Sequence, residues 1–294
     1  MALEKMKRKV GSRLLRVINR ARFEDDFLRY LPYELTSAAR LIYYRNGTSE
    51  EKEIGKNLEV FRASLRDNGA KTIISYPSPH TGEFALDKGG HSVPADRIES
   101  RLSDAANTGV SPIGGILLRR IVTGLNAERV LELGTNTGFS AYYILSAETA
   151  PCLVTVEGSR DLCAIAERNI SRISSKCEVL NMLFDEAIDQ LLAERDRKFD
   201  LIFIDGQHER GALLHYTERC MPLLSSKGGF IYDDIYWSDG MNQAWKDVVS
   251  DLRFGFTVDF QEKGVALKAT DVETKRHFDI CDYIGRPSIF RKNW

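Results

Sequence analysis

The chain is most informative at Arg129-Val130-Leu131-Glu132-Leu133-Gly134-Thr135-Asn136-Thr137-Gly138-Phe139-Ser140. The apolar residues up to Leu133 predict a buried strand, and the segment from Gly134 to Gly138 predicts a tight turn. A helix is expected to open at Gly138, where its free N–H groups and positive dipole favour an anionic group. The stretch therefore predicts a nucleotide-shaped pocket at the end of a strand.

Three later segments repeat the pattern of an apolar strand that ends in an acid. They are Leu153–Glu157, Phe199–Asp205 and Gly228–Asp234. When such strands alternate with helical patterns they form a parallel sheet, and their terminal acids meet in the crevice at its carboxyl edge. Glu157 is placed to accept hydrogen bonds from both ribose hydroxyls of a bound nucleoside.

Composition limits the class of protein. A net charge of −1 gives no global attraction to nucleic acid, so no nucleic-acid partner is expected. The five cysteines are scattered and not arranged in C-x-x-C pairs, which indicates reduced thiols in a cytosol. No apolar run approaches the roughly 20 residues of a membrane span, and no signal-peptide pattern is present. We expect a cytoplasmic protein.

The chain divides into three parts. Residues 1–107 are expected to form a helical N-terminal region and an irregular connector, residues 108–270 the catalytic domain, and residues 271–294 a tail without clear periodicity. Within the first part, helices are predicted over Phe27–Tyr44, 50–66 and 95–106, with a connector or small hairpin over 67–95.

The catalytic part begins with a predicted helix over Ile113–Gly124, which Ser111 can cap with Pro112 in its first turn. It ends with Phe254–Phe260 and Gly264–Lys268, which are predicted to be two antiparallel strands that close the sheet.

Residues 1–22 form a basic amphipathic helix candidate, with apolar residues near helical spacing. One interpretation is an anchor on anionic lipid. The other is a helix that packs on its own domain or on a second subunit of a homodimer. The second is favoured, because Gly11 and Ser12 weaken the helix and bulky aromatic anchors are missing.

The turn after Leu133 resembles motif I of class I S-adenosylmethionine (SAM) methyltransferases, because its glycines are separated by Thr-Asn-Thr and not by the dinucleotide G-x-G-x-x-G spacing. The resemblance implies an α/β fold: a Rossmann-like, seven-stranded, mostly parallel sheet with an α-helical N-terminal appendage. It also implies SAM as cofactor. The expected cofactor-binding residues are Glu132, Gly134, Thr135, Asn136, Gly138, Ser140, Glu157, Met182, Leu183, Phe184 and Asp205.

The acids Asp205, Asp233 and Asp234 are expected to converge at adjacent strand ends. Three carboxylates repel one another unless something positive lies between them, and a divalent cation such as Mg²⁺ satisfies oxygen ligands of this kind. His208, three residues after Asp205, is a candidate general base. Two alternatives stay open: Asp205 binds the SAM amine or the substrate without metal, and His208 caps the helix that begins near Glu209 or bonds Asp205.

These residues resemble metal-dependent O-methyltransferases. The catechol and caffeoyl-CoA types have an acid at the Asp205 position and an Asp-Asn pair at 233–234, where this chain has Asp234 instead of Asn. Macrocin-type sugar O-methyltransferases are more similar, with Asp-x-x-His followed by an acidic pair. That resemblance implies His208 as base and Asp205, Asp233 and Asp234 as metal ligands. Uncharacterised bacterial relatives share the DDI-W-S-GM pattern that begins at Asp233.

The expected function is therefore SAM-dependent O-methylation of a hydroxyl on a small molecule or sugar, with Asp205 and His208 as catalytic residues. The alternatives are a metal-independent N- or carboxyl-methyltransferase of the same fold and a catalytically silent scaffold protein. Trp237 and Trp245 are either walls of a substrate pocket or core residues, and the core is favoured. His80 and His91 are more simply solvated than part of a lid.

Overall fold

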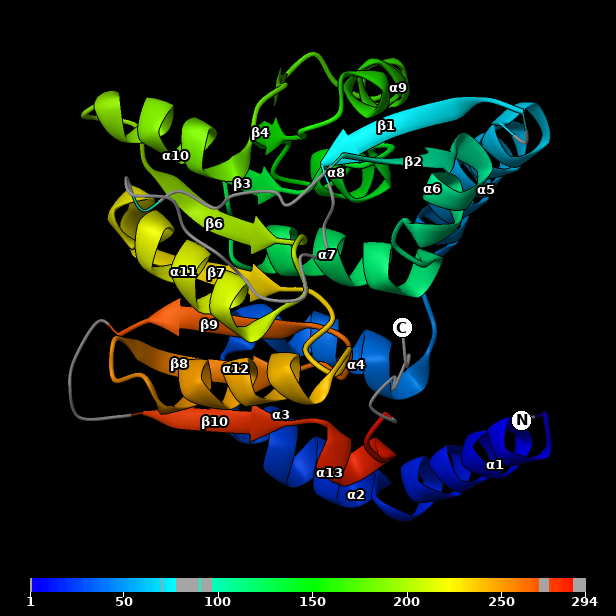
Figure 1. Cartoon of the computed structure of the whole chain (residues 1–294). Coiled ribbons are helices and arrows are strands. Elements are labelled where there is room, and N and C mark those ends of the chain that lie inside the picture. Colours follow the sequence, from blue (N-terminus) through cyan, green and yellow to red (C-terminus); the bar gives the residue numbers. More distant parts are fainter. Residues whose placement is uncertain (1, 70, 78–89, 91–96, 270–274, 288–294) are drawn as a thin grey trace.

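The computed structural model describes residues 2–69, 71–77, 90, 97–269 and 275–287 (Figure 1). Its centre is a sheet with the strand order β10-β8-β9-β7-β6-β3-β4-β5. Neighbouring strands are parallel except where β9 pairs with β7 and β8. The strands are β3 (Arg129–Leu133), β4 (Cys152–Val156), β5 (Cys177–Leu180), β6 (Phe199–Ile204), β7 (Leu224–Tyr232), β8 (Phe254–Asp259), β9 (Gly264–Lys268) and β10 (Arg276–Asp279).

Helices alternate with these strands and also fill the N-terminal third. The α-helices are α1 (Ala2–Ile18), α2 (Arg20–Arg22), α3 (Leu28–Tyr30), α4 (Thr36–Tyr44), α5 (Ser49–Gly69), α6 (Leu102–Thr108), α7 (Pro112–Gly124), α8 (Phe139–Leu145), α9 (Arg160–Ile170), α10 (Phe184–Ala193), α11 (Arg210–Cys220), α12 (Asp239–Ser250) and α13 (Cys281–Ile284). Short π and 3₁₀ turns are η1 (Phe23–Phe27), η2 (Tyr33–Leu35) and η3 (Met221–Leu223). In the described part of the chain, no helix is both long and apolar enough to cross a membrane.

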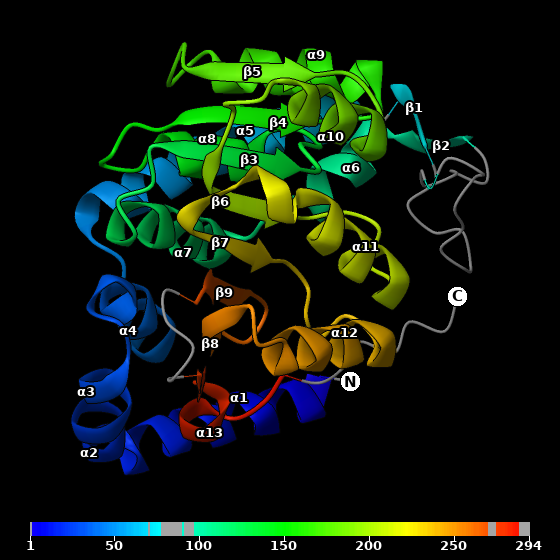
Figure 2. The same cartoon turned by 90° about the vertical axis from the view of Figure 1, so that its left-hand side faces the viewer.

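Alternating strand residues face two different cores, as the two-residue period of a strand requires. Val130 of β3 joins one core with α4, α7, α8 and α9, whereas Leu131 and Leu133 join the other with α10, α11 and α12. The same alternation separates Phe203 from Ile204 in β6. Figure 2 shows the sheet between these two helical layers. Both faces of the sheet are therefore covered, which explains why central strands such as β4 and β6 are mostly apolar.

The strand order reverses between β3 and β6. From β3 the chain moves outward to β4 and β5, then returns to β6 on the other side of β3. In open α/β sheets this switch point leaves a crevice at the carboxyl ends of the strands. The loops after β3, β4, β6 and β7 all lie at this edge, so the predicted site residues share one end of the sheet.

The mostly parallel Rossmann-like fold predicted from the sequence is confirmed, and the described sheet has eight strands instead of the seven predicted. The additional strand is β10, which pairs in parallel with β8. It lies in the segment that was predicted to be a tail without periodicity. Four residues on the edge of a sheet are too few to give a clear alternating pattern.

The N-terminal helices are continuous with the catalytic core. Phe23, Leu35 and Leu41 are fully buried and belong to the same core as Val130 of β3. The helix predicted over Phe27–Tyr44 is broken, because Pro32 disfavours helical geometry in the preceding Leu31, whose ψ is 141°. After the 3₁₀ turn η2, an α-helix begins again at Thr36.

The connector differs from its prediction in one place. The helix expected over 95–106 is instead a strand, β2 (Arg97–Arg101), followed by α6. β2 pairs antiparallel with β1 (Ile73–Pro77), so only one of the two strands lies within the segment 67–95 that was predicted to be a connector or small hairpin. His80 and His91 lie outside the described residues. The predicted cap of α7 is present, since Ser111 Oγ accepts a hydrogen bond from Gly114 N at 3.2 Å.

Candidate active site

The glycine turn after β3 is held tightly against the turn after β6. Gly134 has φ +110°, and a Cβ atom there would lie 1.9 Å from the carbonyl oxygen of Asp205. Gly138 has φ +80° at the start of α8, and Asn136 between them has φ +49°. Only glycine fits at position 134, because any side chain would displace the backbone that carries Asp205.

Glu157 at the end of β4 is tied to this turn. Its carboxylate accepts hydrogen bonds from the backbone N–H of Asn136 at 2.9 Å and of Ser159 at 2.8 Å. Burial raises the pKa of Glu157, and the backbone hydrogen bonds oppose that rise. The carboxylate is half-buried and fixed beside the glycine turn, in the position that the sequence predicted.

Glu132 lies inside the protein. It is completely buried, and its carboxylate accepts a hydrogen bond of 2.6 Å from the hydroxyl of Thr155. Burial raises the pKa of Glu132 to about 7, while hydrogen bonds from Ser140 and Thr155 oppose the rise. Thr155 also lies 2.5 Å from the hydroxyl of Thr135 in the turn. Glu132 therefore supports the turn from within the core.

The segment Met182–Phe184 is half-buried at the start of α10. The ring of Phe184 packs against the turn after β6, since a Cβ on Gly206 would lie 2.7 Å from it. Just before this segment, Asn181 donates a hydrogen bond of 2.9 Å to the carbonyl of Glu157. Sequence reasoning did not single out Asn181, although its place after β5 at the crevice edge was available as a signal.

The structure brings His208 between two of the predicted acids. Its Nε2 lies 3.8 Å from Oδ1 of Asp205 and 3.8 Å from Oδ2 of Asp234. Two neighbouring residues, Gln207 and Asp234, have φ near +50° (48° and 52°), a backbone conformation that costs energy and is concentrated at functional sites. Glu209 occupies the N-cap position of α11, so His208 does not cap that helix.

A buried lysine pairs with the third acid. Lys263, in the turn between β8 and β9, is 2% exposed and forms an ion pair with Asp233. Its ammonium group also lies 5.4 Å from the ring centroid of Phe203. Sequence reasoning missed this residue, because a lysine in a hairpin turn is usually solvated. Lys263 supplies a positive charge that the cluster of carboxylates requires.

The pKa values of this cluster reflect burial and mutual repulsion. Burial and the charge of Asp233 raise the pKa of Asp205 well above its usual value. The same causes raise the pKa of Asp234 to about 7. The pKa of Lys263 is raised as well, because the charges of Asp233 and Asp205 outweigh the effect of burial. Near pH 7, Asp234 therefore exists partly in its protonated form.

Residues 131–235 match the family model described as a methyltransferase domain. Over these residues the chain is therefore similar to a methyltransferase domain. The match begins within β3 and ends just after the Asp233-Asp234 pair, so it includes the glycine turn and Glu157, Asp205 and His208.

Individual proteins resemble the methyltransferase domain to different extents. A catechol O-methyltransferase from Niastella koreensis is 32% identical over 134 residues, which span 45% of this chain and 59% of that protein. The cofactor-bound protein Rv0187 from MTB has a TM-score of 0.50 at 18% identity, covering 72% of this chain and 89% of the other. An O-methyltransferase from Bacillus cereus in complex with SAH has a TM-score of 0.48 at 24% identity, covering 56% and 86%. The structural likeness concerns the fold.

The two tryptophans after the methyltransferase motif have different environments. Trp245 is 2% exposed and belongs to the core, as the sequence favoured. Trp237 is half-buried, and its ring centroid lies 5.8 Å from that of His208. Trp237 therefore flanks the candidate base, whereas Trp245 does not reach the crevice surface.

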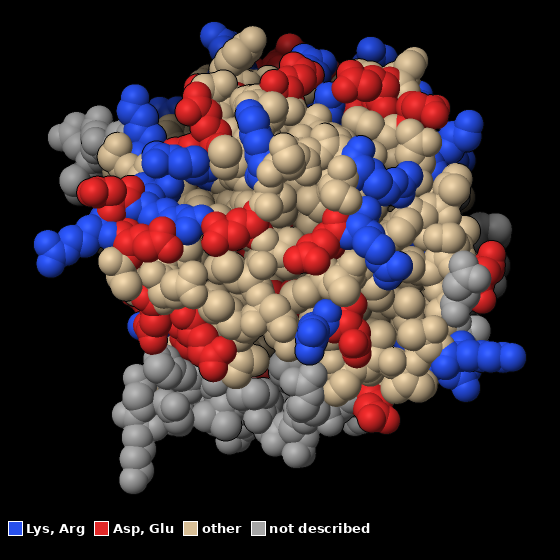
Figure 3. Space-filling view, turned by 90° about the horizontal axis from the view of Figure 1, so that it is seen from above, with Lys and Arg blue, Asp and Glu red and all other residues tan. Residues whose placement is uncertain are grey.

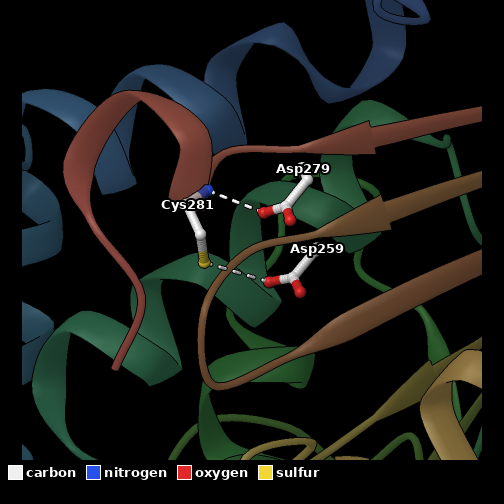
Figure 4. Close-up of side chains that lie close together, drawn as sticks. All are labelled: Asp259, Asp279 and Cys281. Carbon is white, nitrogen blue, oxygen red and sulfur yellow. Dashed lines mark hydrogen bonds between the residues drawn. The ribbon is translucent and has the colours of Figure 1, made fainter. Parts of the chain in front are cut away.

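A second polar cluster lies at the carboxyl ends of β8 and β10 (Figure 4). Among the described residues, Asp259, Asp279 and Cys281 form the one group of three whose ligand atoms all lie within 4.8 Å of one another. Its acids already have protein partners: Tyr236 donates to Asp259 at 2.7 Å, and Arg286 pairs with Asp279. Burial raises the pKa of Asp259 to about 7. This network joins β10 and α13 to the loop after β7.

Proposed function

We propose that this chain transfers the methyl group of SAM to a hydroxyl of a small molecule or sugar. The observation that carries the proposal is the position of His208. It stands between Asp205 and Asp234, at the ends of adjacent strands and on the crevice that Glu157 and the glycine turn border.

The cofactor half of the site fits SAM by its donor and acceptor chemistry. Each oxygen of Glu157 accepts one backbone hydrogen bond, and a carboxylate has about four acceptor positions, so both oxygens can still accept from ribose hydroxyls. We assign the glycine turn, with Thr135, Asn136 and Ser140, to the methionine end, supported from within by Glu132. The adenine side is assigned to Met182–Phe184. When bound, SAM supplies an electrophilic methyl group on a sulfonium centre.

The chemical task of the protein is to position the acceptor and remove its proton. In the proposal His208 accepts the hydroxyl proton at Nε2, and the imidazolium that results is stabilised by the charge of Asp205 or Asp234 at 3.8 Å. Trp237 flanks the imidazole and limits how the acceptor can approach. Catalysis otherwise consists of alignment for in-line displacement.

The Mg²⁺ ion expected from the sequence fits this arrangement poorly. Asp205, Asp233 and Asp234 do not form a group whose ligand atoms all lie close enough for one ion among the described residues. Asp233 is already paired with Lys263, and Asp234 has a pKa of about 7. We therefore propose metal-independent catalysis, in which Lys263 supplies the neutralising charge.

The proposal is tested first for the cofactor and then for the base. Isothermal titration calorimetry should show SAM binding to the folded chain, and failure to bind would favour a silent scaffold. Methyl transfer is then measured with a catechol and with sugar hydroxyls as acceptors. His208→Gln should retain SAM binding and lose about 10²–10⁴-fold in turnover, the range for a general base. His215→Gln is the matched control for the loss of an imidazole, because His215 pairs with Asp185 of α10.

Chelation separates the metal-independent mechanism from the magnesium alternative. Activity should survive exhaustive treatment with EDTA. Loss of activity that Mg²⁺ restores would overturn the role given to Lys263 and would favour the three acids as metal ligands. If the His208→Gln variant turned over as fast as the wild-type protein, His208 would not be the general base.

A further inference from the structure

Helix α1 exposes an apolar stripe to solvent. Val10 is 61% exposed, Leu14 58%, Val17 75% and Ile18 66%. These residues are spaced at i, i+4, i+7 and i+8, so they lie on one side of the helix. The stripe therefore does not pack on its own domain, which leaves the second subunit from the favoured sequence interpretation and the lipid surface as its possible partners.

The other side of α1 fixes the helix to the protein. At its end, Asn19 donates a hydrogen bond of 3.1 Å to the carbonyl of Tyr283. The hydroxyl of Tyr43 donates to the carbonyl of Arg16, and Leu15 lies beside Gly285. Figures 1 and 2 show α1 beside α13 at the β10 edge of the sheet. The helix is thus held along one side while its stripe faces outward.

Positive charge accompanies the stripe. Helix α1 contains six basic residues and a single acid, Glu4; the basic residues are Lys5, Lys7, Arg8, Lys9, Arg13 and Arg16. On a helical projection Arg13 borders the stripe directly, next to Val17 and Val10. By contrast, the face over α9 and α10 in Figure 3 shows acidic and basic side chains interspersed.

We propose that α1 is an interfacial anchor that lies on an anionic membrane surface. An apolar stripe bordered by cations inserts its side chains at the boundary of the acyl chains while the basic residues meet anionic headgroups. A second copy of the chain fits less well, because it would bring two strongly basic helices together. The stripe is short and has no aromatic residue, so binding is reversible and salt-sensitive.

The test is co-sedimentation of the full chain with two kinds of vesicle. Vesicles of phosphatidylcholine with phosphatidylserine should bind the protein, pure phosphatidylcholine vesicles should bind it weakly, and added salt should release it. Val17→Asp should lower binding to the anionic vesicles roughly tenfold or more, since it removes an apolar side chain that inserts into the membrane and adds a negative charge. Val60→Asp is the matched control, because Val60 is a 65% exposed valine on α5.

A second pair of variants tests the charge. Arg13→Glu should weaken binding to anionic vesicles, whereas Arg195→Glu, at another exposed arginine, should not. Circular dichroism confirms that each variant is folded. The proposal would be overturned if Val17→Asp bound anionic vesicles as strongly as the wild-type protein. It would also be overturned if vesicle binding did not depend on lipid charge and salt concentration. A stable dimer that Val17→Asp dissociates, in a protein that does not bind vesicles, would assign the stripe to a second copy instead.

Discussion

The two halves of the crevice are built in different ways. The cofactor half, around β3 and β4, consists of segments close in sequence: Glu157 contacts the backbone of Asn136 only 21 residues away. The acceptor half, around β7 to β10, joins distant segments: Lys263 pairs with Asp233, and Arg286 contacts Tyr236 50 residues earlier. A local motif can be recognised from spacing alone. A charge network that strand pairing assembles from distant segments cannot be recognised in this way, and variants in each half should therefore have separable effects.

The largest effect is expected from Lys263→Met. Removing the cation leaves Asp233 as a buried charge without its partner, which typically costs about 3–5 kcal/mol of folding stability. Unfolding in urea, followed by circular dichroism, measures the loss. The double variant Lys263→Met/Asp233→Asn should recover much of it, because both charges are then absent. Unchanged stability in the single variant would show that the acceptor half does not depend on this pair.

Glu157→Gln tests the cofactor half. An amide cannot accept from both backbone N–H groups and both ribose hydroxyls, so SAM affinity should fall by about 1.5–3 kcal/mol, roughly ten- to a hundredfold. Calorimetry provides the measurement. Glu148→Gln, at an acid whose side chain is 68% exposed, should leave affinity unchanged. If both variants bind SAM equally well, Glu157 is not in the cofactor site.

The change of folding stability with pH should reveal the titration of the Asp259 carboxyl group. Its pKa is about 7 in the folded protein, compared with roughly 3.9 in an unfolded chain. Between these values the folded state holds a proton that the unfolded state has lost. Stability contributed by this group therefore falls as pH rises from about 4 to about 7, by up to about 1.4 kcal/mol per pH unit.

Asp259→Asn should reduce the slope by the share of this one group, since Glu132 and Asp234 also have raised pKa values, and urea unfolding at a series of pH values measures the reduction. Asp239→Asn, at an exposed position, serves as the control and should keep the slope. If the stability of Asp259→Asn changed with pH as steeply as that of the wild-type protein, other acids, such as Glu132 in the cofactor half, would dominate the pH dependence.

The smallest effect is expected from Tyr236→Phe. The phenolic hydroxyl donates to Asp259 at 2.7 Å, and its loss should cost about 1 kcal/mol of stability. Because the network around Asp259 lies apart from Glu157, SAM affinity should not change. A large drop in SAM affinity would show that the two halves are coupled through the sheet.

The sequence predicted the mostly parallel sheet, the glycine turn, the position of Glu157 at a strand end beside that turn and the approach of His208 to Asp205. Each depends on strand-end spacing or on residues within a few positions of one another. Lys263 was not predictable, because its burial depends on how the β8–β9 hairpin folds against β7. The short strand β10 was missed for a similar reason: its pairing with β8, and not its own composition, makes it a strand. Pro32, by contrast, was a visible signal of the helix break.

The contact between Asn19 and Tyr283 joins positions 264 residues apart. During synthesis, helix α1 leaves the ribosome long before α13 exists, so it spends most of translation without the surface that later holds it. In that interval, both sides of a basic amphipathic helix are accessible to chaperones or to a nearby membrane. If α1 is the proposed membrane anchor, the order of synthesis allows it to meet a lipid surface before the fold that holds it is complete.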